Sequence, residues 1–413
     1  MLTRRFFLRG SAVVLAGAGA VPAWLARAAT VEGKKRKTLV AIFQRGAADG
    51  LNIVVPFGEK RYHELRPTLA IAAPTGPNNG NGPQGRAIDL DGMFALHGAM
   101  QPLKALWDQK QLAIVEATGS PDPSRSHFDA QDYMESGTPG KNSGSGWLNR
   151  ALPAEAGSAS PLRAVAMGNQ IPRTLRGDRE AIAIGNSQQF DLGNDEVASI
   201  LQNMYSTTSD VALNRTGKDA FEAMKMIRSI NQTPPSQPAP GNAPQYGQGG
   251  ELGRSLEQLA RLIKGNAGVE GAFAEIGGWD HHGNENAQLF NLLRLFSTAI
   301  AAFCRDMGDR MEDIVLVTMS EFGRTVEENG NAGTDHGHGS VMMVLGGAVQ
   351  GGKVYGKWPG LEKEQLYEGR DLAVTTDFRA VLSELVRGHL GQNDVSAVFP
   401  GFEPAAPLGL LRS

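Results

Sequence analysis

The chain has 413 residues, of which 41% are hydrophobic and 20% charged, and its formal net charge is −3. The ordinary apolar fraction allows a sizeable core, and the acidic balance argues against nucleic acid as a partner. The only cysteine, Cys304, cannot form an internal disulfide, so packing has to supply stability in an oxidising compartment. Its helical spacing from Ile300, Phe303 and Met307 predicts a buried core residue rather than a nucleophile.

The first 28 residues have the three parts of an export signal in order. Arg4-Arg5 precedes a bulky apolar pair, an apolar run and a small-x-small cleavage site that ends at Ala28. This order is typical of a twin-arginine signal peptide. We therefore predict a mature chain that begins at Ala29, uses the twin-arginine export machinery and works in the periplasm or outside the cell. An uncleaved anchor is disfavoured because the run is short and rich in Gly and Ala, and no stable membrane span is expected in the mature chain.

Removal of this signal takes away four arginines and no acid, which leaves 36 basic and 43 acidic side chains and a net charge of about −7. The remaining 385 or so residues are enough for one large or two small domains. Because the strand and helix patterns continue along the whole chain, we predict a single domain over residues 29–413.

Strand and helix patterns alternate along this domain. The predicted strands are Thr38–Phe43, Leu112–Ala117, Leu162–Met167, Gly271–Ile276, Asp313–Met319 and Ser340–Leu345. The predicted helices are Leu96–Trp107, Val197–Tyr205, Asp219–Ile230, Glu251–Lys264, Gln288–Met307 and Asp377–Leu390. Two segments rich in Pro, Gly and Asn, near 73–86 and 231–250, are predicted to be mobile loops. Apolar strands that alternate with helices predict an α/β fold, with a mostly parallel central sheet and helices on both faces.

Polar side chains gather just past the predicted strands, where open α/β sheets bind ligands. Asp280 and His282 lie two apart in a Gly-rich turn after one strand. Asp335, His336 and His338 precede the strand that begins at Ser340. Carboxylate and imidazole ligands suit a borderline ion such as Zn or Mn. We favour such a metal site over the alternative in which these side chains only make hydrogen bonds within turns.

A Ser-rich segment after the second strand offers a nucleophile at the start of a helix, where backbone N–H groups and the helix dipole favour an anion. Ser124 and Ser126 are the candidates, and Arg125 is a candidate anion clamp. An ordinary helix cap explains the same residues equally well. Arg324, close to Glu321, is either a second clamp or the partner of a salt bridge.

Five motifs together resemble a known exported bacterial family, domain of unknown function 1501, over essentially the whole chain. These motifs are FQRGAADGLN (43–52), GSPDPSRSHFDAQDYMESG (119–137), GWDHH (278–282), TMSEFGRT (318–325) and GTDHGHG (333–339). That family is grouped with the alkaline phosphatase and sulfatase superfamily, whose members use metal ions beside a Ser, Thr or modified Cys. The resemblance therefore implies an alkaline phosphatase-like fold, and no general activity is established for the family.

The resemblance also implies roles for individual residues. Asp49, just past the first strand, is similar to the first bridging ligand of the superfamily, and Asp280 and His282 are similar to the Asp and His of one metal site. The GTDH segment that ends at His336 resembles that of phosphopentomutase-like members, so His336 would complete this site. Pro123-Ser124-Arg125 is similar to part of the sulfatase signature, which implies a catalytic neighbourhood around Ser124.

Two positions depart from the superfamily pattern. Pro121 stands where the sulfatase nucleophile would lie, so a formylglycine sulfatase is not expected. Ser320-Glu321-Phe322-Gly323 stands where relatives carry Ser-Asp-His-Gly; Glu321 can bind an ion, but Phe322 cannot. A second ion site is therefore depleted unless His127 or His338 fills it.

We predict a metal-dependent hydrolase of phosphate, phosphonate or sulfate esters that holds one or two divalent ions, Zn or Mn. The predicted metal ligands are Asp49, Asp280, His282, Glu321, His336 and His338, and the predicted catalytic residues are Ser124, Arg125 and Arg324. Its substrate would be a small or polymer-borne anionic ester. The main alternative is an exported binding or assembly protein that keeps the fold without turnover, and a third is a purely structural metal.

Overall fold

The computed structural model describes residues 36–75, 85–140, 143–153, 160–185, 202–232, 243–404 and 406–412. The predicted signal peptide lies outside these residues, as do the middle parts of both predicted loops and residues 197–201 of one predicted helix. Residues Lys37–Ser413 form one compact unit, and the description below concerns this unit alone.

The described residues form a central nine-stranded sheet and a separate three-stranded sheet. Along the path of the large sheet the strand order is β11-β5-β10-β9-β1-β8-β6-β7, and β12 pairs with β5. The central sheet contains β1 (Thr38–Gln44), β5 (Leu112–Gly119), β6 (Ala164–Ala166), β7 (Ile182–Ala183), β8 (Gly271–Ile276), β9 (Ile314–Met319), β10 (Ser340–Gly346), β11 (Lys353–Tyr355) and β12 (Thr376–Asp377). The small sheet contains β2 (Val54–Val55), β3 (Ile88–Asp89) and β4 (Ala95–Leu96).

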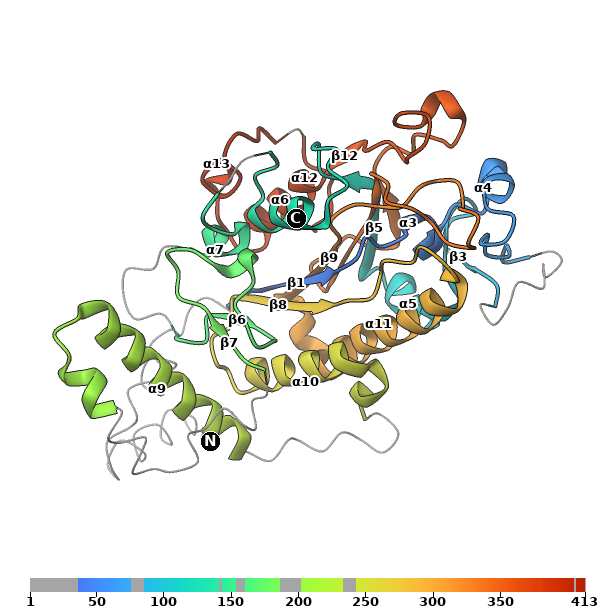
Figure 1. The fold of residues 1–413 in the computed structure, drawn as a ribbon. Helices are drawn as coiled ribbons and strands as arrows, with labels where there is room; N and C mark the ends of the chain where they lie inside the picture. The colour runs from blue at the N-terminus through green and yellow to red at the C-terminus, as the bar shows by residue number, and fades with distance from the viewer. Residues whose placement is uncertain are drawn as a thin grey trace. The chain divides into compact units, whose positions relative to one another are not determined.

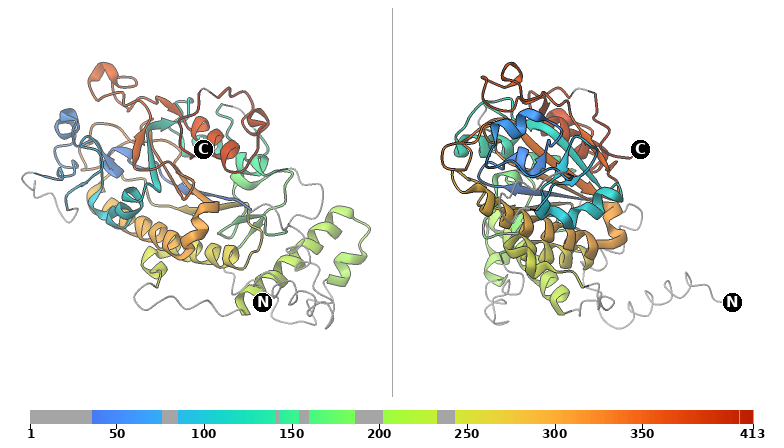
Figure 2. Two further views of the ribbon diagram at one scale, coloured as in Figure 1. Left: turned by 180° about the vertical axis from the view of Figure 1, so that it is seen from behind. Right: turned by 90° about the vertical axis from the view of Figure 1, so that its right-hand side faces the viewer.

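Helices cover both faces of the central sheet (Figure 1). One layer contains α5 (Gln101–Asp108), α10 (Gly250–Lys264) and α11 (Glu285–Met307), with α10 packed on β8. The opposite layer contains α6 (His127–Ser136), α7 (Trp147–Ala151), α12 (Phe378–Gly388) and α13 (Val395–Val398). Both views of Figure 2 keep α10 and α11, in yellow and orange, on the other side of the sheet from the red α12. Helices outside these two layers include α3 (Gly50–Ile53), α4 (Lys60–Leu65) and α9 (Val211–Gln232).

The alternation of side chains along the strands builds a core on each face. Leu39, Ala41 and Phe43 of β1 join a buried cluster with the apolar side of α12, so the intervening Val40 and Ile42 face the other helix layer. All five side chains are fully buried. Because a strand buried on both faces has no polar side, β1 reads as the continuous apolar run TLVAIF.

Parallel strand directions bring the polar segments of the sequence to one edge. The strand β1 runs parallel to β8 and β9, and β10 is antiparallel to both β9 and β5. The carboxyl ends of β1, β5, β8 and β9 therefore meet at the edge where β10 begins. This geometry explains why the Asp- and His-rich segment 333–339 precedes its strand whereas the other polar segments follow theirs.

The predicted α/β class, with a mostly parallel sheet covered on both faces, is confirmed. The predicted helix Leu96–Trp107 is wrong at its start, because Leu96 pairs in β4 and the backbone of His97 is extended before the turn at 98–100. Pro102 then fits the first turn of α5, where an N–H group is not needed. The predicted strand at Leu162–Met167 is shorter than expected, because residues 160–163 form a turn closed by the Arg163 N–H on the Ser160 carbonyl.

Two further boundaries differ from the prediction. The second predicted loop is shorter at both ends, because α9 continues to Gln232 and residues 246–249 form a turn that leads into α10.

Cys304 is buried in α11, as predicted. Residues Glu285–Asp313 are long and apolar enough to cross a membrane by length and composition. In the structure the apolar side of α11 packs against α10 and α5 instead.

Candidate metal centre

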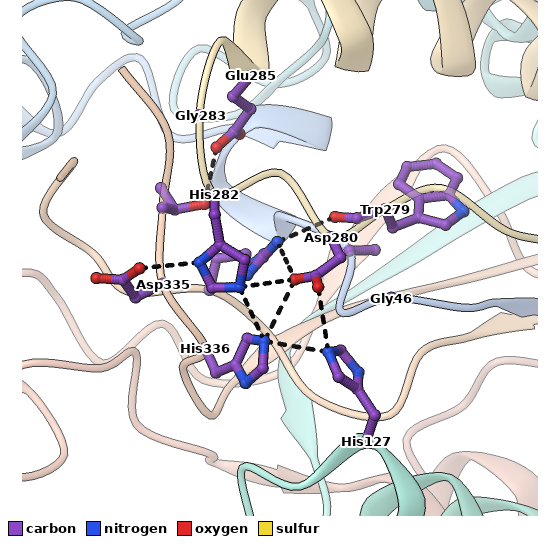
Figure 3. Close-up of polar contacts among 12 residues, drawn as sticks. Gly46, His127, Trp279, Asp280, His282, Gly283, Glu285, Asp335 and His336 are labelled. Atoms are coloured by element: carbon purple, nitrogen blue, oxygen red, sulfur yellow. Dashed lines mark hydrogen bonds and ion pairs between the residues drawn. The ribbon is translucent and has the colours of Figure 1, made fainter. Parts of the chain in front are cut away.

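Three side chains from two of the polar segments converge at the edge of the sheet (Figure 3). The His282 Nε2 atom lies 3.0 Å from Asp280 Oδ1 and 3.1 Å from His336 Nε2. The His336 Nε2 atom lies 3.2 Å from Asp280 Oδ1, which closes the triangle. The structure thus brings together the three residues for which the sequence predicted one metal site.

A fourth side chain, His127, joins this group from the first turn of α6. Its Nε2 atom lies 3.1 Å from His336 Nε2 and 3.6 Å from Asp280 Oδ2. Ligand atoms of His127, Asp280 and His336 all lie within 4.8 Å of one another. We call His127, Asp280, His282 and His336 the open cluster, because a quarter to almost half of each side chain is exposed.

The other ring nitrogen of each imidazole has an oxygen partner. The Nδ1 atom of His336 lies 2.9 Å from the carbonyl of Arg125, which can only accept, so this nitrogen carries a proton. The Nδ1 atoms of His127 and His282 lie 2.9 Å from Glu321 Oε1 and Asp335 Oδ1. Such partners orient the rings, and where Nδ1 carries the proton they leave the Nε2 lone pair free for a metal.

Three Nε2 atoms and a carboxylate face one another, and one oxygen of that carboxylate also accepts from Arg324. Nε2 atoms that carry no proton repel one another and the carboxylate unless a cation lies between them. Ligands at 2.0–2.1 Å around a tetrahedral Zn are about 3.3 Å apart. The separations of 3.0 to 3.6 Å in the open cluster therefore fit such an ion.

Charged neighbours set different proton affinities within the open cluster. Burial opposes the charge of Asp280, but Arg324 and the three imidazoles outweigh it and lower the pKa of this carboxyl. The hydrogen bond to Glu321 raises the pKa of His127, whereas burial lowers the pKa of His336. The carboxylate is thus held charged, which favours cation binding.

Glu321, predicted as a metal ligand, supports His127 from behind. Its Oε1 atom accepts from the backbone of Gly46 and from Gln131, and Oε2 accepts from the Ser320 hydroxyl. Burial opposes its charge, but the hydrogen bonds from His127 and Gln131 outweigh this effect and lower the pKa of Glu321. These contacts occupy the lone pairs that a second ion would need.

Gly46 also fits the turn that carries Asp280. Its φ of 120° suits glycine, and an added Cβ would lie 2.7 Å from the backbone nitrogen of Asp280. Any larger residue here would displace the ligand turn, which explains the glycine that follows β1.

Asp49, also predicted as a metal ligand, lies in a separate set of charges beneath the open cluster. Both of its oxygens accept from Arg66, at 2.5 and 3.0 Å, and neither side chain is more than 1% exposed. Thr334 donates to the fully buried Glu285, whose pKa is raised well above its usual range by burial and by the charge of Asp49. We call Asp49, Arg66, Glu285 and Thr334 the buried network. Arg66 pairs with both oxygens of Asp49 without an ion, and Thr334 serves one oxygen of Glu285, while Glu285 Oε1 has no hydrogen-bond partner among the described residues.

Ser124 and Arg125, predicted as catalytic residues, lie in the loop before α6. The Ser124 hydroxyl accepts from the backbone of Ser126 at 3.3 Å. The Arg125 guanidinium donates to Asp371 and Glu368, so this predicted anion clamp is already paired, while its carbonyl supports His336.

The two other predicted residues, Arg324 and His338, have different places. Arg324 Nη2 donates to Asp280 Oδ1 at 2.8 Å, and its side chain is fully buried. His338 donates to the carbonyl of Ser120 and packs its ring on Tyr367, so no contact joins its ring to the open cluster among the described residues.

Phe322, which the sequence analysis flagged as unable to bind a metal, packs against the open cluster. Its ring centre lies 5.0 Å from the ring centres of both His127 and His336. The sequence analysis left His127 as a conditional ligand and missed Arg66. The position of His127 just past a strand is a usable signal, whereas nothing marks Arg66, which follows α4 and meets Asp49 only in the folded chain.

Solved structures similar to this chain have low identity and low TM-scores. A C-terminal periplasmic domain of EptC from Escherichia coli, in complex with Zn, has 9% identity and a TM-score of 0.33. The match covers 76% of this chain and 74% of the EptC domain. An alkaline phosphatase from the Antarctic bacterium TAB5 has 10% identity and a TM-score of 0.31, with 76% and 93% covered. A lipoteichoic acid synthase, LtaP from Listeria monocytogenes, has 8% identity and a TM-score of 0.30, with 78% and 71% covered.

No curated protein matches the chain in sequence. A family model does match, over residues 36–394, and this range includes every residue of the open cluster. The chain belongs to the family described as "Protein of unknown function (DUF1501)".

Proposed function

We propose that this protein is an exported hydrolase of phosphate or sulfate esters that depends on one divalent ion held by the open cluster. The observation that carries the proposal is the convergence of three imidazole lone pairs on one carboxylate. Such a donor set suits Zn or Mn. An ion held by all four side chains would have to take the ester oxygen as a fifth ligand, as zinc sites can in the transition state. It would then polarise that oxygen and stabilise the charge that develops there.

A single ion is proposed because the other predicted ligands are already engaged. Arg66 occupies both oxygens of Asp49, and Glu321 serves as the acceptor for His127. A second cation beside Asp49 would also meet the buried positive charge of Arg66. The expected stoichiometry is therefore one ion per chain.

The charges around the open cluster support an anionic substrate. Arg324 lies against Asp280, and Arg370 donates to the carbonyl of His336 while keeping more than a third of its side chain exposed. Positive groups at the mouth of a partly exposed site attract anions and stabilise charge that develops on an ester oxygen. The proposed export rests on the twin-arginine pattern of the first 28 residues.

The test combines metal analysis with assays on generic esters. Purified protein, with and without added Zn or Mn, is assayed with p-nitrophenyl phosphate, bis(p-nitrophenyl) phosphate and p-nitrocatechol sulfate. We expect one bound ion per chain and hydrolysis that a chelator abolishes and added metal restores. A protein that binds no ion and stays inert after loading with either metal would exclude the proposal.

A further inference from the structure

The first turn of α6 carries a histidine where an attacking side chain is expected. Free backbone N–H groups make a helix start a favourable place for the anion and for the nucleophile of an ester hydrolase. His127 is the first residue of α6, and it turns Nε2 toward His336 and Asp280. The side chain that faces the open cluster from the start of α6 is therefore an imidazole and not a hydroxyl group.

The serine hydroxyls of the same segment hold the loop and the helix cap. Ser126 accepts from the backbone of Asp129 and caps α6. Ser124 accepts from the backbone of Ser126, and Ser120 accepts from that of Asp122. The Ser124 backbone N–H donates to Asp122. In the part of the chain that the structure describes, however, the hydroxyl of neither Ser124 nor Ser126 hydrogen-bonds to a carboxylate or an imidazole that could take its proton, which an attacking hydroxyl requires.

Two other hydroxyls near the site are fixed by buried acceptors. The single hydroxyl proton of Ser320 is shared between the carbonyl of Gln44 at 2.7 Å and Glu321 Oε2 at 3.0 Å, and Thr334 donates to Glu285 at 2.7 Å. Ser320 is 7% exposed and Thr334 is fully buried, so neither can meet a substrate without breaking these bonds.

His127, in contrast, is held in position. Glu321 Oε1 accepts from its Nδ1 side, and Glu321 itself is fixed by Gly46, Gln131 and Ser320. The Phe322 ring packs on the imidazole. A support of this kind is typical of a metal ligand, whose orientation depends on the partner of its second nitrogen.

We propose that His127 is a ligand of the ion and occupies the place of a nucleophile, so that water attacks the ester directly and no substrate group becomes attached to the protein. This inference rests on the function proposed above. For a phosphate ester, the water oxygen forms a bond to phosphorus while the ester P–O bond breaks. The proton lost by water passes to the leaving alkoxide, so the products are inorganic phosphate and an alcohol.

The experiment separates the ligand role from the chemical step. Zn affinity is measured by titration for the wild type, His127→Ala and His127→Asn, and far-UV circular dichroism checks the fold of each. In parallel, the wild type, Ser124→Ala and Ser126→Asn are mixed with a 32P-labelled phosphate ester and quenched in acid. Asn at position 126 removes the hydroxyl but keeps a good helix cap.

We expect the Zn affinity of both His127 variants to fall on the order of 100-fold. Removal of a hydrogen-bond partner of a ligand already costs about 10–100-fold, and removal of the ligand itself should cost at least as much. We also expect turnover by both serine variants and no label on the protein at any time. A labelled protein that disappears in either serine variant overturns the proposal, as does a His127 variant that binds Zn as tightly as the wild type. If the hydrolase proposal itself is wrong, no variant and no wild type hydrolyses an ester, yet the Zn titration still distinguishes the His127 variants.

Discussion

The open cluster and the buried network each contain an aspartate that follows a strand of the central sheet, but the two aspartates have different partners. In the open cluster, three imidazole nitrogens and a carboxylate present acceptors to one another. In the buried network, Arg66 supplies donors to both oxygens of Asp49, and Thr334 donates to Glu285. A partly exposed set in which several ligand-type atoms face one another suggests a binding site, whereas a buried set built on an arginine–aspartate pair suggests a structural element.

Arg324 lies between the two sets. It donates to Asp280 in the open cluster. Burial opposes the charge of Asp49, but Arg66 outweighs this effect and lowers the pKa of that carboxyl, and the charge of Arg324 adds a smaller lowering effect. Its Nε and Nη1 atoms are buried without a hydrogen-bond partner among the described residues. The distinction between the two sets therefore depends on which side chains pair locally, and substitutions in each set can test it.

His336→Ala should abolish metal binding without unfolding the protein. This histidine contacts both neighbouring imidazoles and Asp280, so its loss opens the cluster at its centre. We expect Zn affinity to fall on the order of 100-fold or more and ester hydrolysis to fall with it. Isothermal titration and the p-nitrophenyl phosphate assay measure the two effects. The matched control, His63→Ala on α4, should keep both; equal losses in the two variants would contradict the assignment.

Arg66→Met should show the reverse pattern. Removal of one partner of a buried ion pair costs about 3–5 kcal/mol, because the remaining charge is left without compensation. The folded fraction should still bind Zn with wild-type affinity, since Arg66 does not contact the open cluster. Urea unfolding followed by a Zn titration at low denaturant checks both statements. A variant that is as stable as the wild type but no longer binds Zn would contradict this prediction, because Arg66 would then support the metal site rather than the fold.

Glu321→Ala and Asp335→Ala should weaken metal binding to different degrees. Both carboxylates accept from the Nδ1 side of a ligand histidine, and removal of such a partner costs about 10–100-fold in affinity. The Glu321 side chain is fully buried and that of Asp335 is 54% exposed. We therefore expect the larger loss for Glu321, because water replaces the exposed acceptor more readily. Zn titration of the two variants decides the order, and an equal or reversed order would count against the role of burial.

Glu116→Gln should change the pH dependence of stability and leave both sets intact. Glu116 is 2% exposed, one of its carboxyl oxygens has no hydrogen-bond partner among the described residues, and burial raises its pKa well above the usual range. A raised folded-state pKa contributes stability below the unfolded pKa, and this contribution is lost as pH rises toward the folded value. Glutamine avoids that loss.

We expect Tm of the Glu116→Gln variant to exceed that of the wild type by a few degrees at pH 7 and to match it near pH 4. Thermal unfolding across this pH range measures the difference. The exposed Glu364→Gln should show no such trend. A variant that is less stable at pH 7 than at pH 4, relative to the wild type, would reverse the sign and contradict the buried neutral state of Glu116.

The sequence by itself determined the α/β class, six of the twelve strands of the described residues and the segments that supply the site. Mostly apolar runs such as Thr38–Gln44 indicate strands that are buried on both faces. Ligand-type residues follow the ends of these strands, where open α/β sheets bind their ligands. The strand ends thus offered Asp280, His282 and the segment with Asp335, His336 and His338 as candidate ligands, and the family resemblance grouped Asp280, His282 and His336 as one site. Short elements such as β4 were not, because a two-residue strand has no period to detect.

Only the tertiary structure decided which acids lie among the imidazoles of the open cluster and which pair with a buried arginine. Asp49 and Asp280 both follow a strand, but Arg66 reaches only the first from a helix that carries no sequence mark of its destination. His127 enters the open cluster because β5 and β10 run in opposite directions and bring residues 127 and 336 to one edge. Charge pairing depends on distances of a few ångströms between segments remote in sequence, and these distances are set by packing rather than by local pattern.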